Sequence, residues 1–143
     1  MANIVPDSFK TDLLGGVFDF DSSGGSTFKL ALYTDISGFS TSTTAYTTTN
    51  EVSSSGTSYT AGGNQLTNNG VAVASNIAYV DFADLTFSSV TLSAVGALIY
   101  KDTSNEAVLV LDFGGTKTAT NGDFVIQFPT ADSSNAIIRL GDA

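Results

Sequence analysis

Residues 94–113 run Ala94-Val95-Gly96-Ala97-Leu98-Ile99-Tyr100, then a polar link from Lys101 to Asn105, then Glu106-Ala107-Val108-Leu109-Val110-Leu111-Asp112-Phe113. Two short apolar segments joined by a polar link are typical of a β-hairpin. The run from Val108 to Leu111 is apolar at every position, as in a strand that is buried on both faces. We therefore expect this strand to lie centrally in a sheet.

Further strands are predicted on both sides of this hairpin. From Thr27 onward the apolar period is two, with Phe28, Leu30 and Leu32 on one face and Lys29, Ala31 and Tyr33 on the other. The remaining predicted strands are Val71 to Ser75, Ile77 to Ala83, Phe87 to Leu92, Asp123 to Phe128 and Ala136 to Leu140, with turns at Asp84 to Thr86, Gly114-Gly115 and Asn121-Gly122-Asp123. Many short strands predict an all-β fold, an antiparallel β-sandwich of immunoglobulin-like or jelly-roll-like type.

One helix is predicted near the N-terminus. Pro6-Asp7-Ser8 is a typical helix start, with Asp or Ser able to cap free N–H groups. Phe9, Leu13 and Val17 then form one apolar stripe, which predicts a helix over residues 7–18. Gly15-Gly16 supports a competing interpretation, a helix that ends at Leu14 before a strand from Val17 to Phe20. We expect one domain over residues 1–143, with the sandwich over residues 26–140.

The charge of the chain excludes several partners. Its 143 residues carry 14 acidic and 5 basic side chains, a net charge of −9, and Arg139 is the only arginine. Nucleic-acid binding requires a basic surface that displaces counterions from phosphates, so neither a nucleic acid nor an anionic membrane is an expected partner.

Little in the chain predicts catalysis. Cysteine and histidine are absent, which removes thiolate chemistry and the commonest general base. Asp19-Phe20-Asp21-Ser22-Ser23-Gly24 matches the opening of an EF-hand loop, but Leu30 stands where the bidentate glutamate belongs, so we expect an ordinary turn. Acid pairs for a glycosidase, Asp81 with Asp84 or Glu51 with Asp112, are interpreted as structural carboxylates. We predict a protein that is not an enzyme and has no cofactor and no metal.

The candidate contact residues lie in two places. Residues 36–57 form a Ser/Thr-rich segment, predicted to be a long loop with one short strand around Ala45 to Asn50. Phe39, Tyr46 and Tyr59 lie in or beside it, either as a contact surface for a partner or as anchors that hold the loop on the core. Phe9 and Leu13, on the apolar side of the predicted helix, are the other candidate contacts.

Several segments together resemble a family of small structural proteins from tailed bacteriophages, many of them marine or cyanobacterial. They are Ser8-Phe9-Lys10 with Leu13-Leu14, Thr27 to Thr34, Thr49 to Val52 with Tyr59 to Gly63, Gly96 to Tyr100, Val110 to Gly114, Phe124 to Pro129 and Ala136 to Leu140. The resemblance implies a component of the virion and carries no catalytic residues.

From this resemblance we expect a capsid decoration (cement) protein on the outer head, with the major capsid protein or other virion proteins as partners and a homo-oligomer on the particle. The alternative is a tail, neck or baseplate component that contacts a host receptor. A free carbohydrate-binding module is a third hypothesis, against which the absence of tryptophan counts. Residues Met1 to Pro6 lack the basic start and apolar stretch of a signal peptide, so we expect synthesis in the host cytoplasm and localisation in the virion.

Overall fold

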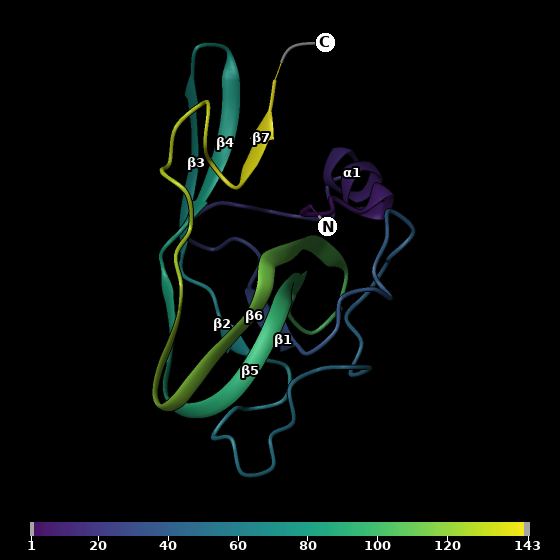
Figure 1. Cartoon of the computed structure of the whole chain (residues 1–143). Coiled ribbons are helices and arrows are strands. Elements are labelled where there is room, and N and C mark those ends of the chain that lie inside the picture. Colours follow the sequence, from purple (N-terminus) through teal and green to yellow (C-terminus); the bar gives the residue numbers. More distant parts are fainter. Residues whose placement is uncertain (1, 142–143) are drawn as a thin grey trace.

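A computed structural model describes residues 2–141 of the chain (Figure 1). Its elements are α1 (Asp7–Leu14), β1 (Phe28–Tyr33), β2 (Asn64–Gln65), β3 (Asn68–Ala74), β4 (Ile77–Phe82), β5 (Leu85–Lys101), β6 (Ala107–Ile126) and β7 (Ile138–Leu140). The strands form two antiparallel sheets, one in the order β2-β1-β5-β6 and the other in the order β3-β4-β7. The predicted all-β, sandwich-like fold with one short helix is confirmed.

The larger core lies between the two sheets and the N-terminal segment. Phe28, Leu30 and Leu32 of β1 face it, and Phe82 of β4 meets them from the other sheet. The Phe20 and Phe28 rings stack with centroids 4.7 Å apart. The intervening side chains of β1, among them Tyr33, enter a second core on the opposite face of the four-stranded sheet. β1 is therefore buried on both faces, because the chain covers each side of this sheet.

The prediction that the strand around Val108 to Leu111 is central in its sheet is wrong. β6 is the last strand of the order β2-β1-β5-β6. Its outer edge is covered by other segments: Ile4 and Val110 exchange two backbone hydrogen bonds of 2.9 Å, and the Ala107 N–H donates to the Thr44 oxygen. These contacts exclude water from an edge strand that is apolar on both faces.

The helix is shorter than the predicted range of residues 7–18. It ends at Leu14, where the Val17 N–H donates to the Asp12 carbonyl and the Gly16 N–H to the Leu13 carbonyl. Gly16 has φ of +81°, so these bonds form a Schellman motif, in which glycine takes the left-handed position. No side chain caps the N-terminus, and Val17 to Phe20 forms no strand, so the competing interpretation was right only about the helix end.

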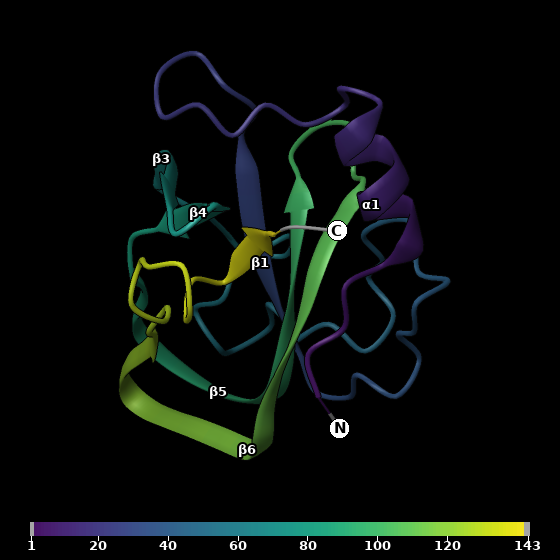
Figure 2. The ribbon, with the colours of Figure 1, turned by 90° about the horizontal axis from the view of Figure 1, so that it is seen from above.

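Two long strands replace several predicted turns. β5 begins at Leu85, inside the turn predicted at Asp84 to Thr86. β6 runs through the turns predicted at Gly114-Gly115 and Asn121-Gly122-Asp123. Between the pairs Ala94↔Lys117 and Gly96↔Asp112, a single residue of β5 faces four of β6. Such a bulge bends the ribbon without ending it. Figure 2 shows the two strands, teal and green, turning sharply together.

Candidate functional site

Glu51, in the long loop between β1 and β2, lies at the centre of a polar cluster. One of its carboxylate oxygens, Oε1, accepts hydrogen bonds from the Tyr59 hydroxyl at 2.7 Å and from the Gly62 N–H at 2.6 Å. The other, Oε2, accepts one from the Tyr46 hydroxyl at 2.6 Å. We call Glu51, Tyr46, Tyr59 and Gly62 the Glu51 cluster. Three hydrogen bonds to one carboxylate hold three points of the loop at fixed positions.

Further bonds join the Glu51 cluster to the four-stranded sheet. The Tyr59 hydroxyl also accepts the Leu32 N–H of β1 at 3.0 Å, and the Tyr100 hydroxyl of β5 donates to the Gly62 oxygen at 2.7 Å. The Tyr46 and Tyr100 rings stack with centroids 4.5 Å apart. The predicted strand around Ala45 to Asn50 is absent; single bridges pair Ala45 with Glu106 and Glu51 with Tyr33. The loop is thus held by side chains rather than by a strand.

Burial, above all, raises the pKa of the Tyr33, Tyr46 and Tyr59 hydroxyls well above the ordinary 10.0, with the Glu51 carboxylate adding to the shift. It raises the pKa of Tyr100 to about 12. The unfolded chain therefore releases tyrosine protons above about pH 10, while the folded chain keeps them. Fewer protons are then bound in the unfolded state, so the free energy of unfolding falls as pH rises.

We predict that urea midpoints decrease steadily from about pH 10 toward about pH 12, with little change between about pH 8 and pH 9.5. The tyrosinate absorbance of these four side chains should rise only as the chain unfolds. Equal midpoints at pH 9 and pH 11 would show that the four hydroxyls are accessible to solvent in the folded protein.

The structure places the five predicted contact residues as follows. Phe9, Phe39 and Tyr59 are buried, with exposed fractions of 3%, 8% and 3%. The Phe39 ring packs edge-on against Tyr33, with centroids 4.9 Å apart. Phe39, Tyr46 and Tyr59 thus make the contacts of the anchoring alternative. Tyr46 and Leu13 are half-buried, and a contact of either with a partner stays a prediction.

Apolar side chains are exposed mainly at another place, between the helix and the second sheet. A groove of about 730 Å³ lies between α1 and β7, which face each other in Figure 1. Val5, Leu14 and Leu140, with exposed fractions of 41%, 82% and 57%, line it together with the half-buried Leu13 and Ile138. Val71 of β3 lines a smaller hollow that shares Leu13, Ile138 and Leu140 with this α1–β7 groove.

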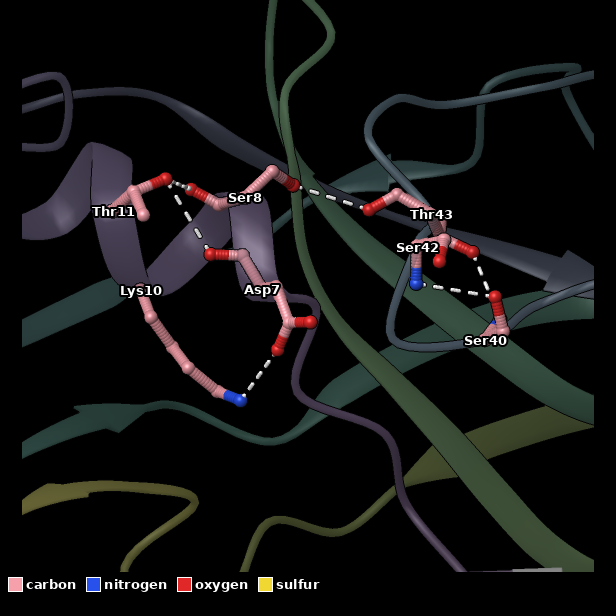
Figure 3. A network of polar contacts seen from close by, with 7 residues as sticks. All are labelled: Asp7, Ser8, Lys10, Thr11, Ser40, Ser42 and Thr43. Carbon is pink, nitrogen blue, oxygen red and sulfur yellow. Dashed lines mark hydrogen bonds and ion pairs between the residues drawn. The ribbon is translucent and has the colours of Figure 1, made fainter.

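The start of α1 is fixed to the rest of the molecule by polar contacts (Figure 3). The Ser8 hydroxyl donates to the Thr43 oxygen at 3.1 Å, and the Asp7 N–H donates to the Thr41 oxygen at 2.8 Å. Lys10 pairs with Asp7 at 2.8 Å on the helix surface. These contacts fix the start of the helix to the long loop that follows β1.

The acid pairs considered from the sequence have structural partners. Asp81 accepts a hydrogen bond from the Asn69 side chain at 2.7 Å, and Asp84 accepts the Phe128 N–H at 2.8 Å. Glu51 pairs with Tyr33, Tyr33 with Gly96 and Gly96 with Asp112 across the sheet. Three interstrand spacings, about 14 Å, therefore separate the Glu51 and Asp112 backbones. The carboxyl groups of glycosidases lie about 5–9.5 Å apart.

Two other candidate centres also have structural contacts. The Asp19 carboxylate accepts the Asp21 N–H at 2.9 Å, a turn contact within the EF-hand-like segment. Within residues 2–141, no three acidic side chains gather where they could hold a metal ion. Ser26 and Lys29 stand at the Ser-x-x-Lys spacing of a catalytic dyad. Lys29 instead approaches Asp102 at 3.6 Å, and the Ser26 hydroxyl accepts the Asp19 N–H.

The sequence indicated the helix side of the α1–β7 groove and not the side formed by β7. Its lining comes from segments that are far apart in the chain, and only the fold brings Val5, Leu14 and Leu140 together. Phe9 and Leu13, predicted from the sequence as contacts on the helix, also line the groove, whereas nothing in the sequence indicated the residues of β7. Among residues 2–141, no helix has the length and apolar character needed to cross a membrane.

Comparison of the chain with protein-family models, with curated proteins and with solved structures finds no match, so its function is inferred from its own sequence and geometry.

Proposed function

We propose that this chain is a non-enzymatic structural protein of a tailed-phage virion, a decoration protein that binds the outer surface of the assembled head. The α1–β7 groove carries this proposal. Of the six large apolar side chains exposed among residues 2–141, three line the groove and Val71 lines the hollow beside it. Exposed apolar side chains gathered at one place mark a contact surface rather than ordinary scatter.

The charge of the chain fits such a role. A net charge of −9 keeps free copies apart in solution, so the exposed groove is not filled by uncontrolled self-association. A protein that binds only the assembled shell stabilises that shell by mass action. The sequence resemblance to phage structural proteins supports the same role, with the major capsid protein as the surface that fills the groove.

Sedimentation of purified protein with assembled heads tests the proposal through Leu14→Ser. Burial of a leucine contributes about 1.5–3 kcal/mol, so we expect the variant to bind about 10-fold to 100-fold more weakly. Leu14 is 82% exposed, so its replacement should leave the fold intact.

The matched control is Val125→Ser, because Val125 is 53% exposed and lies outside the groove. It should sediment with the heads like the original protein. Equal binding of Leu14→Ser and the original protein, or no binding of either, would overturn the proposal.

A further inference from the structure

Another hollow lies inside the bend of β6 and shares one lining residue, Ile137, with the α1–β7 groove. Its volume is about 480 Å³. Leu111 to Phe113 line it from one arm of β6, and Asp123 to Ile126 line it from the other. Because both arms contribute, the hollow occupies the concave side of the bend that the bulge at Gly114-Gly115 creates. We call it the elbow pocket; the bend is visible in Figure 2.

The floor of the elbow pocket is apolar and held in place. Phe113 and Phe128 line it and are half-buried, so part of each side chain stays accessible. The Phe113 ring packs against Phe124 with centroids 6.0 Å apart, and the Phe128 ring packs against Phe82 at 5.7 Å. A ligand would therefore meet phenylalanine rings whose positions are already fixed, which lowers the entropy cost of binding.

The rim of the elbow pocket is polar and contains both positively and negatively charged side chains. Lys117 and Gln127 are exposed there, and no ion pair of Lys117 or side-chain hydrogen bond of Gln127 is found within residues 2–141. Asp123 uses one carboxylate oxygen to accept the Ser89 N–H at 3.3 Å. Its second oxygen, the Lys117 ammonium and the Gln127 amide offer both donors and acceptors to a ligand.

We propose that the elbow pocket binds a neutral sugar residue. The C–H face of a sugar ring matches an apolar floor of phenylalanine rings, and its hydroxyl groups match a rim of mixed donors and acceptors. Small-molecule sites have volumes of about 300–1,000 Å³, apolar linings and a few polar groups. The net charge of −9 disfavours an anionic ligand. Phenylalanine supplies the ring surface in a chain without tryptophan.

This site is independent of the proposed head-binding surface. The elbow pocket and the α1–β7 groove share one lining residue, Ile137, and none of the pocket's three charged lining residues, Asp112, Lys117 and Asp123, lines the groove. A decoration protein with such a pocket would hold a glycan on the outside of the particle. Head binding can fail while sugar binding is retained, and the reverse also holds.

The test is a titration of the purified, isotope-labelled chain with methyl glycosides of glucose, galactose and mannose and with N-acetylglucosamine, followed by amide NMR shifts. We expect at least one of these sugars to shift amides of residues 111–128, with a dissociation constant of about 1 mM. Glycerol, which has hydroxyl groups but no ring, should cause no such shifts at the same concentration.

Lys117→Ala and Gln127→Ala should each weaken the binding several-fold, because each removes a hydrogen-bonding group from the rim. Both side chains are exposed, so their loss leaves the floor of the pocket intact. Leu14→Ser, in the groove, should bind the sugar like the original protein. No shift with any of the four sugars, equal shifts with glycerol, or shifts confined to other surfaces would overturn the proposal.

Discussion

Gly63→Ala is expected to cost about 4 kcal/mol of unfolding free energy or more, a large share of the about 5–15 kcal/mol that holds a domain folded. Gly63 has φ of +76°, a conformation that a side chain disfavours. A Cβ at this position would also overlap the backbone carbonyl of Leu30 in β1. Leu30 is fully buried, so the loop and not the strand would have to move. Urea unfolding measures the loss.

Gly38→Ala is the matched control. Gly38 lies in the same long loop, has no positive φ, and a Cβ there would meet no atom within 4 Å. Its replacement should change the unfolding free energy by less than about 1 kcal/mol. If Gly63→Ala unfolds at the same urea concentration as Gly38→Ala, residue 63 does not pack against β1 as described.

Glu51→Ala is the second variant with a large expected effect, a loss of about 3–5 kcal/mol. The substitution removes the acceptor of three hydrogen bonds, and it leaves the Tyr59 hydroxyl and the Gly62 N–H without that partner under the loop. Hydrogen bonds to a charged group contribute about 1.5–3 kcal/mol each, and a buried donor left unpaired adds a desolvation cost. The free energy of unfolding in urea is again the measurement.

Single hydroxyl deletions separate the contributions within the Glu51 cluster. Tyr46→Phe should cost about 1–2 kcal/mol, because it removes one bond to Glu51. Tyr59→Phe should cost more, because the Leu32 N–H also loses its acceptor. A loss below about 1 kcal/mol for Glu51→Ala would contradict the anchoring role of this carboxylate.

The sequence predicted the elements whose signals are local. The period of two around Phe28, Leu30 and Leu32 gave β1, and the polar link from Lys101 to Asn105 gave the hairpin between β5 and β6. The two strands predicted on either side of Asn76 are joined by a turn, in which Ser75 and Asn76 both have positive φ. Each of these features is decided by neighbouring residues, so a sequence pattern suffices.

The errors concern decisions made by distant parts of the chain. Val108 to Leu111 looked central because both faces are apolar, yet Ile4 and Thr44 cover the edge of β6. Gly114-Gly115 looked like a turn, yet pairing with β5 continues beyond it. A glycine pair permits either a turn or a bulge, and only the partner strand determines which one forms.

The candidate site was predictable only in part. Tyr46 and Tyr59 were found because aromatic residues in a polar loop are unusual, but Glu51, interpreted as a structural carboxylate, was not recognised as their common partner. Of the α1–β7 groove the sequence indicated only Phe9 and Leu13 on the helix, because the other lining residues follow no shared sequence pattern. Leu14 and Leu140 are 126 positions apart in the chain.

Electron cryo-microscopy of the virion tests the central claim most directly, because it shows where this protein lies and how many copies are present. A decoration protein must be present in dozens to hundreds of copies on the outer head, with α1 and β7 turned toward the capsid subunits. A dozen copies or fewer at the tail, neck or baseplate would contradict the account, as would a head whose decoration leaves Leu14 and Leu140 facing solvent.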